Sequence, residues 1–157
     1  MTNPIRVRAL SKVVDVTLST DTSAYISGDL LADTQIMTDA FWAQGGTGTV
    51  TSITVIDEDD QGQALDVVFL RANNTLGTEN SAPTISDANA RDILGYVNVP
   101  SATYIDLGGV RVASVNNIRL GVQAASGTSD LYVAAISRGT GTYTASGLKL
   151  RIHIQGD

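Results

Sequence analysis

The stretch from position 147 to position 155 constrains the fold more than any other part of the chain. Apolar and polar residues alternate along it. The apolar set is Leu148, Leu150, Ile152 and Ile154, and the polar set between them is Lys149, Arg151, His153 and Gln155. This period of two is typical of a β-strand with one buried face and one solvated face. The rest of the chain therefore has to supply a second apolar layer against this strand.

Short runs of the same kind recur along the chain. They occupy residues 13–18, 25–31, 50–56, 64–70, 96–99, 110–115, 118–124 and 131–137. About eight or nine short strands with frequent turns are typical of a sandwich. The sequence thus predicts an all-β fold, an antiparallel β-sandwich of jelly-roll-like form. One short helix is expected over residues 86–94, begun by Ser86 and stopped by Gly95, where it would plug an end of the sandwich.

The turns suggest how these strands pair. The acidic turn at 57–62 predicts a hairpin between 50–56 and 64–70, and a longer loop predicts another between 131–137 and the C-terminal strand. Asn116 and Asn117 suit a tight turn between their flanking strands. Gly28 predicts a β-bulge within the run 25–31.

Several apolar side chains have predicted positions. Ile36, Phe41 and the single tryptophan, Trp42, are expected to be largely buried. Leu65, Val67 and Phe69 should share one face of their strand. The opposite face is mixed, so that strand either lies centrally or contacts another subunit. The polar loop 71–83 is expected at a contact surface or to be mobile.

Length and charge divide the chain into two parts. The 157 residues suit one domain with one core. We assign residues 1–12 to an extended N-terminal arm and residues 13–157 to a single sandwich. The arm carries Arg6, Arg8 and Lys12 and no acid, although the whole chain has a net charge of −6. The acidic remainder argues against nucleic acid as a partner, whereas the arm suits an acidic protein surface or is a frayed tail.

Disulfide-bonded and membrane-spanning classes of protein are excluded by what the sequence lacks. There is no cysteine, so disulfides and thiolate metal sites are excluded. No apolar stretch is long enough to cross a membrane as a helix, so no membrane partner is expected.

One acidic loop invites a calcium hypothesis. Asp57, Asp59, Gln61 and Gly62 have the spacing of the first half of an EF-hand loop, but Val68 stands where the closing glutamate is needed. An EF-hand is therefore excluded. A looser calcium site and a solvated turn tip remain as alternatives, and we favour the turn tip.

No catalytic constellation is visible. His153 is the only histidine, and it lies on the predicted solvated face without a nucleophile motif. The glycine stretches at 45–48 and 139–141 do not continue into a phosphate-binding motif. We expect no enzyme activity and no cofactor.

Four stretches together resemble a known family. Residues 25–30, 59–70, 81–88 and 138–148 read YISGDL, DDQGQALDVVFL, SAPTISDA and RGTGTYTASGL. They are similar to the capsid decoration, or cement, proteins of tailed bacteriophages. The resemblance extends over most of the chain from about residue 25 onward, and its motifs are structural rather than catalytic.

The resemblance implies a jelly-roll protein of the virion that binds the outer surface of the head and stabilises the capsid. Its partners would be the major capsid protein and further copies of itself, a homotrimer being favoured. A trimer would account for the apolar residues on both faces of 64–70. Arg6, Arg8 and Lys12 are then the expected capsid contacts.

Two alternatives stay open. A tail, baseplate or head-fibre component would use the same sandwich. A carbohydrate-binding module would need exposed aromatic platforms, for which the candidates are Tyr25, Tyr104, Tyr132 and Tyr143.

Overall fold

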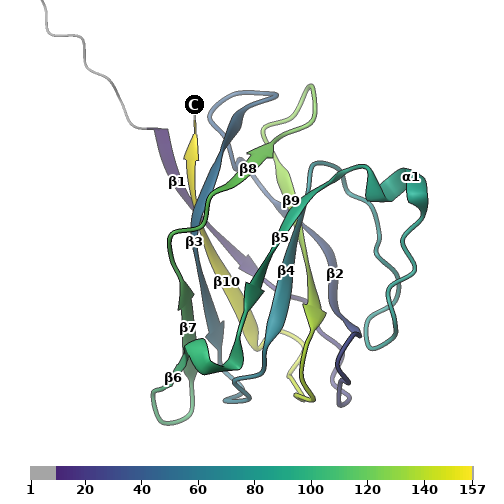
Figure 1. Ribbon diagram of the computed structural model, residues 1–157, viewed down its shortest axis with the longest axis vertical. Coiled ribbons are helices and arrows are strands. Elements are labelled where there is room, and N and C mark those ends of the chain that lie inside the picture. The colour runs from purple at the N-terminus through teal and green to yellow at the C-terminus, as the bar shows by residue number, and fades with distance from the viewer. Residues whose placement is uncertain (1–9, 157) are drawn as a thin grey trace, which may run out of the picture.

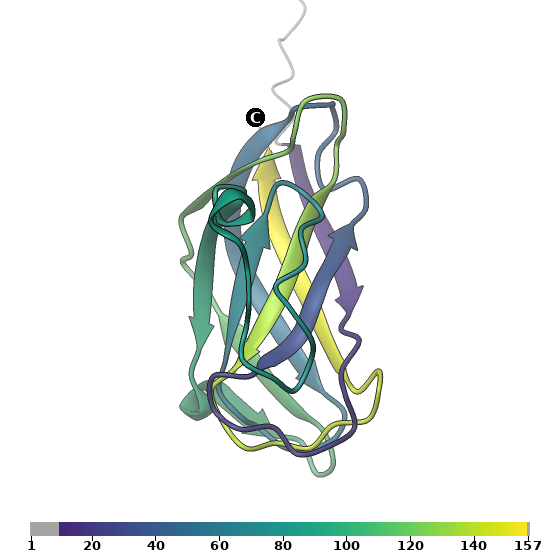
Figure 2. The same ribbon diagram turned by 90° about the vertical axis from the view of Figure 1, so that its right-hand side faces the viewer.

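The computed structural model describes residues 10–156, which form two antiparallel sheets packed face to face (Figure 1, Figure 2). Sheet A runs in the order β1-β10-β3-β7-β6, and β8 also pairs with β3. Sheet B runs in the order β2-β9-β4-β5. The strands of sheet A are β1 (Leu10–Thr17), β3 (Thr47–Asp57), β6 (Tyr104–Asp106), β7 (Arg111–Val115), β8 (Leu120–Gln123) and β10 (Leu148–Gly156). Those of sheet B are β2 (Leu30–Met37), β4 (Leu65–Leu70), β5 (Ile93–Val99) and β9 (Leu131–Ser137). Two short helices, α1 (Asp87–Ala90) and η1 (Ser101–Thr103), flank β5.

The strand pairing is that of a jelly roll. The first strand pairs with the last, β2 with β9, β3 with β7 and β8, and β4 with β5. This is the pattern obtained when one long antiparallel ribbon is wrapped so that its successive parts alternate between two sheets. The predicted all-β, jelly-roll-like sandwich with one short α-helix is confirmed.

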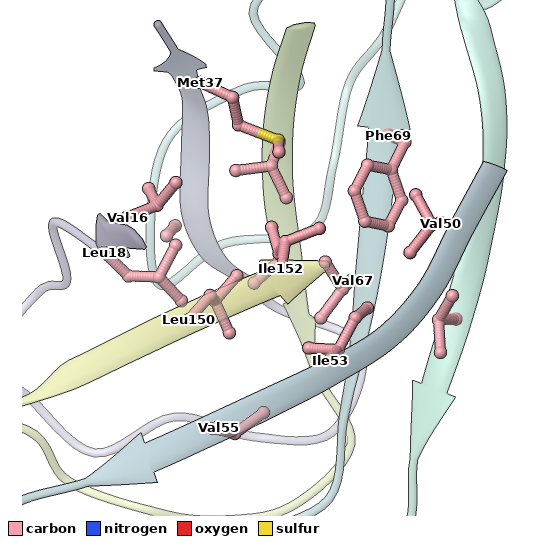
Figure 3. Close-up of a cluster of buried hydrophobic side chains, with 14 of the residues drawn as sticks. Val16, Leu18, Met37, Val50, Ile53, Val55, Val67, Phe69, Leu150 and Ile152 are labelled. Atoms are coloured by element: carbon pink, nitrogen blue, oxygen red, sulfur yellow. The ribbon is translucent and has the colours of Figure 1, made fainter. Parts of the chain in front are cut away.

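The core lies between the two sheets (Figure 3). The apolar residues of β10 all point into it and are buried, and β10 lies between β1 and β3. On the facing sheet, Leu65, Val67 and Phe69 are buried in the same cluster, as predicted. Alternation along each strand thus identifies the inward face correctly, because successive side chains of a strand point to opposite faces.

The predicted hairpins are wrong. β3 and β4 lie in different sheets, and so do β9 and β10, so each connecting loop crosses from one sheet to the other. β7 and β8 both pair with β3 and follow one another along it. Asn117, at φ 58°, lies in the connection between them. Residue patterns show which face of a strand is buried, but they do not show which strand it pairs with.

Three local predictions also need correction. Gly28 has a φ of 103° and lies in a turn before β2, which begins at Leu30, so no bulged strand covers 25–31. Helix α1 is capped by Ser86 as predicted, but it is only one turn long because β5 begins at Ile93. It contributes no buried residue and so does not plug the core.

The predicted arm overlaps the sheet. β1 begins at Leu10, so residues 10–12 pair with the end of β10. Arg6 and Arg8 lie outside the described residues. No helix within residues 10–156 is long and apolar enough to cross a membrane.

Part of the outer face of sheet B is apolar and is covered by the chain itself. Leu76 and Ile85, from the segment 71–85, pack on it. The sheet residues in this second cluster are Leu30, Val68, Leu70, Tyr132, Ala134 and Ile136. Asp33 fixes the segment, because its carboxylate accepts hydrogen bonds from Leu76 N (2.7 Å) and Thr75 Oγ1 (2.6 Å). The apolar outer face of β4 therefore has a partner within the chain and no longer argues for a trimer; the oligomeric state stays a prediction.

Replacing Leu76 by alanine tests this internal cover. Leu76 is 4% exposed, so Leu76→Ala should lower the free energy of unfolding by about 2–3 kcal/mol in guanidinium denaturation. Leu107 is 63% exposed, and Leu107→Ala should change it by less than about 0.5 kcal/mol. Equal effects of the two substitutions would show that segment 71–85 is not packed as described.

Candidate functional site

Lys12 is the one predicted contact residue that the structure places, and its ammonium group is bound within the chain. Its Nζ donates to the carbonyl oxygens of Asp39 (2.6 Å) and Phe41 (3.2 Å). It also lies 4.3 Å from the centroid of the Trp42 ring, within the range of a cation–π interaction. Lys12 thus joins the first strand to the loop that follows β2.

Trp42 is exposed, contrary to prediction. It is 64% exposed, and Ile36 is exposed as well, whereas Phe41 is buried as predicted. Phe41 packs directly on glycine backbone: a Cβ atom added at Gly46 would lie 2.6 Å from the Phe41 Cβ. This close approach fixes Phe41 inward and leaves the tryptophan ring beside it on the surface.

The loop that carries Trp42 is held by a second loop. Asp39 N donates to Asp130 Oδ1 (2.8 Å), and Ser129 Oγ donates back to Asp39 Oδ1 (2.9 Å). Phe41 N donates to Ser129 O (3.0 Å). Both loops lie at the end of the sandwich where β1 begins and β10 ends, at the top of Figure 1. The loop that carries the tryptophan is therefore held in place by hydrogen bonds to its neighbour.

A fixed, exposed tryptophan beside a cation has the chemistry of a protein-docking site. Tryptophan and arginine are over-represented among residues that dominate binding energy, and the cost of binding falls when the anchor is already ordered. We call this the Trp42 surface: Trp42, Lys12 and the loop 38–46. Sequence reasoning missed this surface, because no local pattern distinguishes Trp42 from its buried neighbour Phe41.

The acidic loop between β3 and β4 is a structural feature. Asp57 is fully buried, and its carboxylate accepts hydrogen bonds from the backbone N–H groups of Asp59 (3.0 Å), Gln61 (2.9 Å) and Gly62 (2.7 Å). Burial raises the pKa of Asp57, and the three N–H donors act in the opposite direction. The favoured solvated turn tip is therefore wrong for Asp57, whose oxygens hold the backbone of the loop.

No metal centre is formed within residues 10–156, where no group of three or more His, Cys, Asp or Glu side chains could hold an ion. Two further polar side chains of the acidic loop bind the crossover loop between β9 and β10. Asp59 Oδ2 accepts from Thr144 N (2.9 Å), and Gln61 Oε1 accepts from Thr142 N (3.2 Å). Two of the stretches that carry the family resemblance, 59–70 and 138–148, are thus locked together.

The histidine and tyrosine candidates do not form a site. His153 lies on the outward face of sheet A between Val13 and Ser52. Tyr25 and Tyr143 are buried with ring centroids 6.1 Å apart. Burial raises the pKa of Tyr25 to about 12, and its hydroxyl donates to Leu31 O (3.0 Å). Tyr104 and Tyr132 pack against the two apolar clusters, so none of the four is an open sugar platform.

Comparison with known proteins does not assign a family. No family model and no curated protein matches the chain. Among solved structures, the chain is similar to the Tomato aspermy virus structure, with 10% identity, 99% of this chain and 81% of the other covered, and a TM-score of 0.40. The chain is also similar to the Israeli acute paralysis virus particle, with 7% identity. That match covers 95% of this chain and 72% of the other, with a TM-score of 0.38. A third similar structure is the K3 cleaved adhesin domain of Lys-gingipain from Porphyromonas gingivalis, with 14% identity. That match covers 85% of this chain and 71% of the other, with a TM-score of 0.36. Likenesses at these levels carry no argument about function.

Replacing Asp57 by asparagine tests the structural role of the acidic loop. An amide cannot accept from all three N–H groups, so at least one buried or part-buried donor loses its partner, at a cost of about 1–3 kcal/mol in unfolding free energy. Glu58→Gln is the matched control, because Glu58 forms an exposed ion pair with Lys149. That control should cost less than about 1 kcal/mol. An unchanged free energy of unfolding in Asp57→Asn would contradict the assigned role.

Proposed function

We propose that the protein is a structural component of a bacteriophage virion that binds the outer surface of the head as a decoration protein and stabilises the capsid. The proposal rests on the resemblance of four sequence stretches to cement proteins. The jelly-roll topology is compatible with it. We propose the major capsid protein as the partner, no enzyme activity, and a homotrimer as the assembled form.

The Trp42 surface is the proposed contact with the capsid, and its exposed tryptophan is the observation that carries the assignment. The predicted arm joins the described chain at Leu10, two residues before Lys12. Lys12 in turn contacts the Trp42 ring, so the described chain begins close to Trp42. An apolar anchor that acts together with Arg6 and Arg8 of the arm suits a capsid surface that is apolar at its centre and acidic around it.

The role of Lys12 in this proposal differs from the expected one. Its ammonium already binds two carbonyl oxygens and the tryptophan ring, so Lys12 orders the anchor. We assign the attraction to acidic groups of the capsid to Arg6 and Arg8. A tail, baseplate or head-fibre location is the alternative, and it would use the same contact surface.

Removal of the tryptophan ring tests the docking surface. Trp42→Ala should weaken binding of the purified protein to phage heads that lack it by about thirtyfold, equivalent to about 2 kcal/mol, because tryptophan anchors commonly contribute that much. Leu107→Ala is the control, since Leu107 is equally exposed but follows β6 at the opposite end of the sandwich. Cryo-electron microscopy of the heads would measure occupancy. Full occupancy with Trp42→Ala would contradict the proposed contact, and density on the tail alone would favour the alternative.

The charge of the arm has a separate test. The double variant Arg6→Gln and Arg8→Gln should slow association with the heads at low salt and make binding less dependent on ionic strength, because exposed charges steer encounter and are screened by salt. Surface plasmon resonance at two salt concentrations measures both effects. An unchanged association rate would remove the arm from the contact.

A further inference from the structure

The outer face of sheet B has a hollow beside its internal cover. It lies over β4, β5 and β9, which run side by side in Figure 1. Its volume is about 230 Å³, and its lining residues are Asp66, Val68, Ile93, Tyr96, Ile136 and Arg138. The residues of the Trp42 surface do not line it, so it is a separate feature of the fold.

Strand register brings the lining residues together. Val68 on β4 pairs with Tyr96 on β5, and Asp66 pairs with Asn98 on one side and with Ile136 on the other. Since alternate residues of a strand share a face, all of these side chains point outward from the same part of the sheet. An aromatic ring and a polar group thus lie next to each other along β5.

The polar side of the hollow is a neutral, hydrogen-bonded group. Asp66 is buried; its Oδ1 accepts from Asn98 Nδ2 (2.8 Å) and its Oδ2 from Arg138 Nε (2.6 Å). A carboxylate offers about four lone-pair positions, and a guanidinium has four N–H groups besides Nε. The pair can therefore both accept hydrogen bonds from a bound ligand and donate hydrogen bonds to it.

The apolar side is an exposed ring above an aliphatic floor. Tyr96 is 66% exposed, whereas Val68 and Ile136 beneath it are buried. The face of an aromatic ring carries partial negative charge and attracts C–H groups that carry partial positive charge. A few directed polar groups beside an apolar surface are typical of a small-molecule site.

We propose that this hollow binds a neutral pyranose sugar of an oligosaccharide. A pyranose has one face of C–H groups, which suits Tyr96, and an edge of hydroxyl groups, which suits Asp66 and Arg138. A pure hydrocarbon would cover the polar pair without replacing its hydrogen bonds to water, which is costly. An anionic ligand would gain little from Arg138, because Asp66 already neutralises the guanidinium, and it would face a chain of net charge −6.

Binding of the full chain to a printed array of neutral and sialylated glycans tests the proposal. We expect binding to neutral pyranose glycans and none to their sialylated forms. Isothermal titration with the neutral glycan that binds best then compares variants. Tyr96→Ala should weaken binding by about tenfold, and Tyr96→Phe, which keeps the ring, by less than about threefold.

The matched control is Trp42→Ala, which removes the other exposed large aromatic ring of the described chain and should leave glycan binding unchanged. Thermal unfolding of each variant separates loss of binding from loss of folding. The proposal is overturned if no neutral glycan binds, or if a folded Tyr96→Ala binds as well as the parent chain. It is also overturned if the array is negative and Tyr96→Ala abolishes self-association in sedimentation velocity, which would make the hollow a contact between copies. Capsid occupancy is independent of all these results.

Discussion

The burial of two facing rows of apolar side chains is the interaction on which the other features depend. Each sheet has an inward face that only the other sheet can cover, and β10 lies in the middle of this arrangement between β1 and β3. Because consecutive strands mostly alternate between the sheets, the chain crosses between them at both ends of the sandwich. The crossing loops are therefore where polar locks such as Asp57 and exposed anchors such as Trp42 occur.

Sequence periodicity predicted the fold class and the inward faces, but it could not predict the pairing. The alternation in β10 and the buried set of β4 depend only on neighbours along the chain. The partners of β3, β4, β9 and β10 depend on how the whole ribbon wraps, and no local turn signal reports that. The cover on the outer face of β4 could not be predicted locally either, because it comes from a polar loop that contributes one buried leucine, Leu76.

The candidate surfaces were harder to predict than the fold. Phe41 and Trp42 were both expected inside, and this holds for Phe41 but not for Trp42, whose position is decided by neighbours distant in sequence. Conversely, the tyrosines that looked like surface platforms, Tyr25 and Tyr143, belong to the core. A prediction from residue type alone places an aromatic ring inside because the ring is hydrophobic. Whether that ring is buried depends on which residue takes the adjacent core position.

The pairing of Leu10 with Gly156 places both limits of the described chain next to the Trp42 surface. A label, fusion partner or displayed antigen attached directly at Leu10 or Gly156 would crowd that surface. The turn between β6 and β7 lies at the far end of the sandwich, and its Gly108 and Gly109 both have positive φ angles and open space around them. Exposed turns of this kind accept inserted sequence readily. That turn is accordingly the natural site for an inserted sequence that has to leave the Trp42 surface open.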